Sequence, residues 1–131
     1  MVLDEERLSR FIFCKDHFST LKNEVKYGAF IPPKNLELSI YRSNFLSENE
    51  IWKIGKNNVT ELRADNKKII SRADITTSLV RIKGLDAISK PTPHPLHADI
   101  IGWSSDKSLQ KLKAQELALL ASLSLPTTED I

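Results

Sequence analysis

The residues best suited to chemistry lie in a proline-rich stretch, residues 91–103, which reads Pro-Thr-Pro-His-Pro-Leu-His-Ala-Asp-Ile-Ile-Gly-Trp. Its prolines hold alternate φ angles at about −65°, so this loop is ordered before any ligand binds. His97 and Asp99 are two residues apart, and on a strand they would share a face. Because imidazole exchanges protons near neutral pH, His97 and Asp99 are candidates for an acid–base pair, with His17 as a third catalytic candidate.

Hydrolysis by such an acid–base pair needs a nucleophile. Several serine and threonine hydroxyl groups are possible, and the sequence does not single out one of them. None lies in a Gly-x-Ser-x-Gly turn, and the candidates are Thr76, Thr77, Ser78 and Ser104. A working His97 is expected to be partly exposed, with its pKa raised by the nearby carboxylate. The alternative is structural: one histidine packs under the sheet with a backbone partner, and the other closes a loop.

The two histidines and Asp99 also match the ligand types that zinc and iron accept. A metal site needs a further ligand from elsewhere, and the sequence contains neither a cysteine pair nor a His-Glu-x-x-His motif. Its four glycines are too scattered to form a phosphate-binding loop. We therefore expect neither a metal nor a cofactor.

Arginines in or beside predicted strands form the second group of candidate residues. A strand arginine is costly to bury unless it is paired, and two on one face would clamp a phosphate or a carboxylate. The candidate ligand-binding residues are Arg10, Arg42, Arg72, His94 and Trp103. For Arg72 the simpler alternative is an ion pair with Asp74, two residues along the same strand face.

The elements that must position these residues follow from hydrophobic patterning. Runs of β-branched and aromatic residues, or alternating apolar and polar residues, predict strands over 8–14, 36–42, 72–82 and 97–101. Ser47 and Glu50 have the capping-box spacing and predict a short helix, which Gly55 would end in the left-handed conformation. Residues 56–68 are polar and basic and predict a long loop.

A longer helix is predicted over residues 106–123, capped by Ser105 or Asp106. Its apolar positions 109, 112, 117, 120 and 123 are expected to face the core. The predicted fold class is therefore α+β: a small, mostly antiparallel sheet covered by a long C-terminal helix. At 131 residues the chain is expected to form a single domain, residues 1–131, with a flexible tail from about residue 126.

Composition and charge limit the cellular compartment and the kinds of partner that fit this sequence. Nineteen Lys and Arg stand against 17 Asp and Glu, and the single Cys rules out an internal disulfide. The start of the chain is acidic and no apolar run reaches the ~20 residues that span a bilayer, so we expect a cytoplasmic protein without membrane contact. Residues 53–90 hold nine basic and four acidic side chains but no aromatic one, which predicts at most weak, salt-sensitive nucleic-acid binding.

Several segments carry a resemblance. Residues 10–13, 29–32, 39–42, 50–55, 72–74 (Arg-Ala-Asp) and 97–103 (His-Ala-Asp-Ile-Ile-Gly-Trp) together resemble a group of small uncharacterised bacterial proteins. The resemblance implies a complete small bacterial protein and transfers no activity to any residue.

Two classes of function fit these observations. The first is a binding or regulatory module that acts through a protein partner, which is favoured because it requires no unidentified nucleophile. The alternative is a small hydrolase or transferase on a phosphate-bearing or nucleotide substrate, using His97 and Asp99 with the strand arginines. Convergence of these side chains in one concave pocket would favour the enzyme. The sequence does not indicate an oligomeric state.

Overall fold

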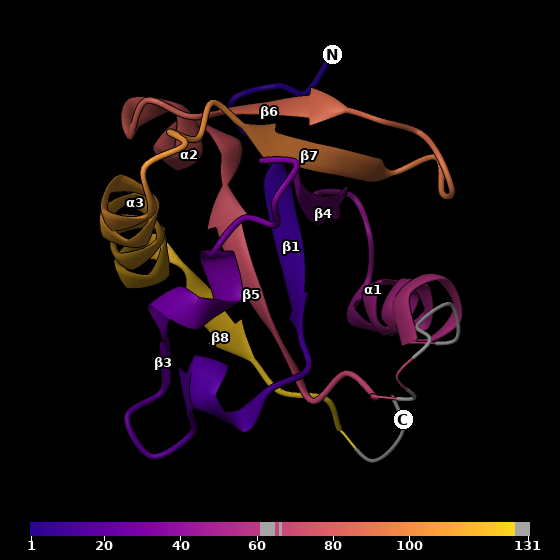
Figure 1. Ribbon diagram of the computed structural model, residues 1–131. Coiled ribbons are helices and arrows are strands. Elements are labelled where there is room, and N and C mark those ends of the chain that lie inside the picture. Colours follow the sequence, from indigo (N-terminus) through magenta and orange to yellow (C-terminus); the bar gives the residue numbers. More distant parts are fainter. Residues whose placement is uncertain (61–64, 66, 128–131) are drawn as a thin grey trace.

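A computed structural model describes the whole chain except residues 61–64, 66 and 128–131. Its centre is a six-stranded sheet in the order β6-β7-β4-β1-β5-β8, with every neighbouring pair antiparallel (Figure 1). The strands are β1 (Arg7–Ile12), β4 (Leu38–Arg42), β5 (Ser71–Thr76), β6 (Asp86–Ser89), β7 (His97–Ile101) and β8 (Ser122–Ser124). The fold is therefore α+β with an antiparallel sheet, as the sequence predicts.

Helices and short turns complete the fold. The α-helices are α1 (Glu48–Ile54), α2 (Thr77–Ile82) and α3 (Lys107–Leu120). Short helical turns are the 3-10 segments η1 (Lys15–His17) and η2 (Tyr27–Phe30) and the π-helical segment η3 (Gly55–Thr60). A separate two-stranded ribbon joins β2 (Phe18–Ser19) to β3 (Glu24–Val25). Among the described residues no helix is long and apolar enough to cross a membrane.

The two faces of the sheet have different covers. One face packs against α3 and η2 through a large apolar core that includes Leu8, Ile40 and Ile100. The other face lies under α1 and η3 and has a smaller, aromatic core around Phe11, Tyr41 and Trp52. Figure 1 shows α3 and α1 on opposite sides of the central strands. Successive side chains of a strand point to opposite faces of the sheet, so alternate residues pack against α3 and η2 or against α1 and η3.

Two local predictions are confirmed. β7 begins at His97 and ends at Ile101, as the apolar run after the proline loop predicts. Ser47 caps α1, with its hydroxyl accepting from the Glu50 N–H while the Glu50 carboxylate accepts from the Ser47 N–H. Both features depend on contacts within a few residues, which is why the sequence alone indicates them.

The predicted strand over 72–82 is wrong in its second half. β5 ends at Thr76, and the chain then turns into α2. The N-terminal segment accounts for the turn: the Thr77 N–H and hydroxyl both donate to the Glu6 carbonyl, and the Ser78 N–H donates to the Asp4 carbonyl. These long-range bonds satisfy the first N–H groups of a helix, and they override the β-propensity of the residues.

Gly55 does not take the predicted left-handed conformation. Its φ of −56° and ψ of −46° are those of a right-handed helix, and the chain continues into η3. Glycine is needed there for space, because a Cβ would come within 2.6 Å of both Ile69 Cδ1 and Phe11 Cε1. The predicted loop over 56–68 is thus helical at its start, and residues 61–64 and 66 lie outside the described part of the chain.

The C-terminal helix is shorter than predicted and presents a different face. α3 has 14 residues, is capped by Asp106 and ends at Leu120, because residues 122–124 pair with β5 as strand β8. Its buried positions are Gln110, Ala114, Leu117 and Ala118. Of the predicted core positions Leu117 is buried, whereas Leu109 and Leu112 are each 50% exposed. Ala114 and Ala118 are small and let the helix lie close to the sheet. The prediction followed the spacing of the large apolar residues and therefore missed this face. Most of the predicted tail from residue 126 lies outside the described residues.

Candidate functional site

Strand register brings the proline loop residues beside β4. β4 and β7 pair so that Ser39 lies opposite Asp99 and Tyr41 lies opposite His97. All four side chains project from the sheet face that α1 and η3 cover, since Leu38, Ile40, Ala98 and Ile100 point into the other core. The register therefore places a serine, a histidine and a carboxylate next to one another.

Ser39 and His97 form a direct hydrogen bond, with Oγ and Nε2 2.7 Å apart. The other ring nitrogen, Nδ1, lies 2.9 Å from the Lys90 carbonyl oxygen. A carbonyl only accepts, so neutral His97 carries its proton on Nδ1 and leaves Nε2 as an acceptor. The Ser39 hydroxyl then donates to Nε2, which is the arrangement of a nucleophile with its general base.

Asp99 shares the face of His97 as predicted, but it does not orient the ring. Its Oδ1 lies 3.8 Å from His97 Nε2, the nitrogen that faces Ser39, and the Lys90 carbonyl occupies the Nδ1 side instead. The carboxylate is 3% exposed, and among the described residues its Oδ2 makes no hydrogen bond although Lys90 Nζ lies 3.5 Å away. Asp99 is thus a buried carboxylate placed close to both His97 Nε2 and Lys90 Nζ.

A cavity of about 290 Å³ lies against this pair. Pro93 of the proline loop forms part of its wall, together with His97 and Ser39. The remaining lining residues are Arg10, Phe11, Phe13, Tyr41, Asn58 and Val59. His97 is only 7% exposed, so it lacks the partial exposure expected of a working His97–Asp99 pair. Ser39 is half-buried, so a ligand in the cavity meets the serine more readily than the imidazole.

The cavity exists because β1 and β4 separate. β1 and β4 pair only at Leu8 with Arg42 and at Ser9 with Tyr41. β1 remains paired with β5 as far as Ile12. Past that point the Arg10 side chain bridges the gap, with Nη1 donating to the Ser39 carbonyl at 2.9 Å and Nε donating to the Ala29 carbonyl at 3.0 Å. Arg10 therefore supports the backbone of the serine and lines the cavity as well.

Neither His94 nor His17 lines the cavity. His94 Nδ1 accepts from the Leu96 N–H, and the His94 and His97 rings both pack edge-on against Tyr41. Burial lowers the pKa of His94, and the charge of nearby His97 lowers it further. Burial also lowers the pKa of His17, with Arg10 as the second cause. Both histidines therefore favour the neutral state in the folded chain.

Arg42 and Trp103 are engaged in the fold away from the cavity. Arg42 forms a two-pronged ion pair with Glu6, with Nε to Oε1 at 2.8 Å and Nη2 to Oε2 at 3.0 Å. Trp103 is buried in the large core, and its Nε1 donates to the Ile100 carbonyl. Neither side chain lines the Ser39–His97 cavity.

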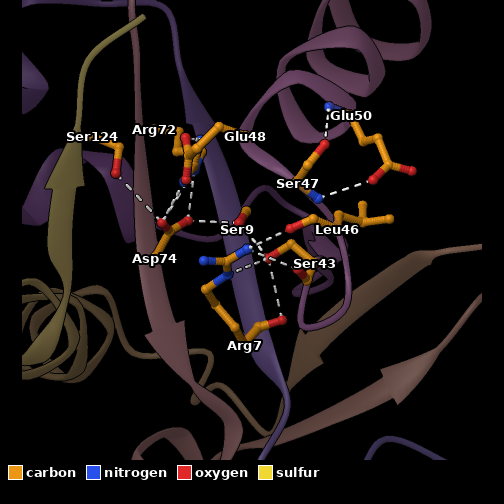
Figure 2. Close-up of polar contacts among 10 residues, drawn as sticks. All are labelled: Arg7, Ser9, Ser43, Leu46, Ser47, Glu48, Glu50, Arg72, Asp74 and Ser124. Atoms are coloured by element: carbon orange, nitrogen blue, oxygen red, sulfur yellow. Dashed lines mark hydrogen bonds and ion pairs between the residues drawn. The ribbon is translucent and has the colours of Figure 1, made fainter.

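Arg72 belongs to a second polar cluster on the same sheet face (Figure 2). Its guanidinium donates to both carboxylate oxygens of Glu48 and to both of Asp74, which realises the predicted pair with Asp74. Asp74 in turn accepts from Ser9, whose hydroxyl lies 2.7 Å from that of Ser43. With Arg72 1% exposed and its donors occupied, this cluster is an internal support rather than an open site.

The residue that sequence reasoning missed is Ser39. None of the four hydroxyl residues proposed as nucleophiles lines the cavity, and Thr77 instead bonds to the Glu6 carbonyl. Ser39 has one signal in the sequence, its place on the polar side of the alternating run 36–42. Its closeness to His97 depends on the pairing of two strands far apart in the chain, which that alternation does not specify.

Among the described residues, no group of three or more His, Cys, Asp and Glu side chains is placed to hold a metal ion. No protein-family model, curated protein or solved structure matches the chain. The resemblance to small bacterial proteins stays a prediction. Function is therefore inferred from the geometry of the site alone.

Proposed function

We propose that this protein is a small serine hydrolase or acyltransferase, with Ser39 as the nucleophile and His97 as the general base. The observation that carries the proposal is the 2.7 Å bond from Ser39 Oγ to His97 Nε2, in a ring whose Nδ1 is held by the Lys90 carbonyl. This pair borders a cavity of about 290 Å³. A base fixed in one tautomer beside a hydroxyl is the element that serine-dependent acyl transfer needs.

The steps follow from the positions of the donors and acceptors. Ser39 Oγ attacks the acyl carbon while its proton passes to His97 Nε2, and Asp99 stabilises the imidazolium that forms. The protonated Nε2 then donates to the leaving oxygen or sulfur, whose bond to the acyl carbon breaks. A water or an acceptor alcohol, deprotonated by Nε2, attacks the acyl-serine ester. The bond from the acyl carbon to Ser39 Oγ then breaks, and Nε2 returns the proton to that oxygen. Asn58 lines the cavity and brings a side-chain amide, the donor type that stabilises an oxyanion.

The lining supports a small, largely apolar acyl group. Phe11, Phe13, Tyr41, Val59 and Pro93 supply an aromatic and aliphatic wall. Two of the three arginines expected to clamp a phosphate are bound to Glu6, Glu48 and Asp74 instead. We therefore infer an uncharged ester or thioester as the substrate class, in place of a phosphate-bearing one.

Covalent labelling tests the proposed nucleophile. The folded protein is incubated with a fluorophosphonate and with p-nitrophenyl butyrate, and the labelled residue is identified by mass spectrometry. We expect one adduct on Ser39 and a measurable turnover of the ester. Ser39→Ala should lose both, and His97→Gln should lower the turnover by about 10²–10⁴-fold.

Ser104→Ala is the matched control, because Ser104 is exposed and does not line the cavity. It should label and turn over like the unmodified sequence, and circular dichroism should show that all variants are folded. A protein that stays unlabelled, or an adduct on a residue other than Ser39, would exclude the proposed mechanism.

A further inference from the structure

A second hollow lies on the other side of the sheet, between η2 and α3. Its volume is about 620 Å³, roughly twice that of the Ser39–His97 cavity. The lining residues are Tyr27, Ile31, Pro32, Pro33, Lys34, Leu36, Ser105, Lys107, Gln110 and Lys111. Tyr27 and Ile31 remain 40% and 36% exposed, so the folded chain leaves this apolar floor open to solvent.

The charged side chains that line this hollow are all basic. Lys34, Lys107 and Lys111 are all exposed, and its described lining contains no acidic side chain. Lys111 Nζ lies 5.0 Å from the centre of the Tyr27 ring, so the ammonium group is held over the apolar floor. Three ammonium groups above an apolar surface complement a ligand that carries both carboxylates and an apolar group.

The hollow continues along α3. An adjoining depression of about 520 Å³ shares Tyr27 and is lined by Glu24, Val25, Lys26, Gln115, Ala118 and Leu119. Leu119 is 86% exposed there. Lys111 and Leu119 are eight residues apart on one helix, which corresponds to about 12 Å. An extended peptide covers that distance in about four residues.

We propose that these two depressions form one docking groove for an acidic peptide segment of a partner protein. Its carboxylates would pair with Lys107 and Lys111, and an apolar side chain about four residues away would cover Leu119. An aromatic residue flanked by prolines and lysines at one end, with exposed Leu119 at the other, suits a peptide whose acidic residues are followed about four positions later by an apolar one. The groove lies on the sheet face opposite Ser39, so this proposal stands or fails independently of the proposed catalysis.

The test uses a fluorescein-labelled peptide, Glu-Asp-Ser-Gly-Ser-Leu-Phe, and the full chain. We expect saturable one-to-one binding by fluorescence anisotropy, with amide shifts in NMR spectra confined to β3, η2, α3 and the groove-lining segment 31–36. Lys107→Glu with Lys111→Glu should weaken binding by about tenfold or more, because like charges would then face each other. Leu119→Ser should weaken it through the apolar contact alone.

Lys53→Glu with Lys56→Glu is the matched control, since it changes the net charge equally on the α1 side. It should bind like the unmodified chain. A peptide with Lys in place of Glu and Asp should not bind. Equal competition by a single-stranded oligonucleotide, or equal weakening by the control variant, would show attraction by charge alone and overturn the proposal. Absence of saturable binding would overturn it as well.

Discussion

Arg72 is a charged side chain that the fold removes almost completely from water. Burial alone would lower its pKa, but the hydrogen bonds that it donates to Glu48 and Asp74 outweigh burial and raise it. The guanidinium also lies 5.0 Å from the ring centre of Trp52, so α1 contacts it with both a carboxylate and an aromatic face. One residue thereby joins β5 to the helix that covers the sheet face carrying Ser39 and His97.

Replacing Arg72 should lower the stability of the folded chain substantially. Arg72→Met leaves Asp74, whose side chain is 12% exposed, without its counter-charge. We expect the free energy of unfolding to fall by about 3–5 kcal/mol, measured by urea denaturation. Arg81→Met is the comparison, because Arg81 also pairs with two carboxylates, those of Asp4 and Asp86, but at the surface. It should cost about 1 kcal/mol or less, and equal costs would show that burial of the Arg72 cluster is unimportant.

Among the elements, α3 is held by a narrow contact. Only Gln110, Ala114, Leu117 and Ala118 of its 14 residues are buried, and the Gln110 amide donates to the Ser104 carbonyl just ahead of the helix. Leu117 is thus the single large apolar side chain that this helix buries. The rest of its surface, including the lysines of the docking groove, is available to solvent or to a partner.

Leu117 and Leu109 should therefore respond differently to truncation. Leu117→Ala removes a fully buried side chain and should lower the free energy of unfolding by about 2–5 kcal/mol. Leu109→Ala removes one that is 50% exposed and should cost about 0.5 kcal/mol or less. Thermal or chemical denaturation of the two variants checks this, and a large loss from Leu109→Ala would indicate that a second copy or a partner covers that side of α3.

The elements that the sequence predicts well are those built from neighbouring residues. The alternating run around Leu38 and Ile40, the capping box at Ser47 and the strand at His97 all depend on local spacing. The change from β5 to α2 depends on bonds to residues more than seventy positions away, as the Thr77 hydroxyl on the Glu6 carbonyl shows. Local propensity has no access to such contacts.

The same distinction applies to the candidate site. His97 and Asp99 share a strand, so their common face was predictable, whereas Ser39 meets them through a pairing 58 positions apart. Gly55 shows the limit in another form, because its role is to leave room for Phe11 and Ile69. The sequence shows that position 55 is a glycine, but it does not show which side chains pack against that glycine.

At the scale of the whole molecule, the Glu6 carboxylate joins the N-terminal segment to the sheet. Glu6 is 5% exposed and accepts from Arg42 of β4 and from the Leu3 N–H. The hydrogen bond from Arg42 lowers the pKa of Glu6 in the folded chain. Glu48, which holds Arg72, has its pKa lowered in the same way.

These shifts predict how stability changes with pH. Because the folded pKa of Glu6 is below its ordinary value of 4.5, its stabilising contribution is full above that value and is lost as the pH falls through the folded pKa. We expect the melting temperature to decline with acidification below about pH 5, and Glu6→Gln to flatten that decline while lowering stability at pH 7. Glu5→Gln, at an exposed neighbouring position, should leave the profile unchanged. A Glu6→Gln profile parallel to that of the unmodified chain would contradict this account.

The strand order also has a consequence for synthesis. β1 comes first in the chain, yet it lies between β4 and β5, which follow it by some thirty and sixty positions. While a ribosome is still making residues 43–70, β1 has at most one neighbour, so the edge that later pairs with β5, including Phe11 and Ile12, stays open to pairing with other chains. β1, which supports both the Ser39 cavity and the Arg72 cluster, therefore has both of its strand neighbours only after Thr76 has emerged from the ribosome. The chain is most exposed to aggregation in the middle of translation, before that point.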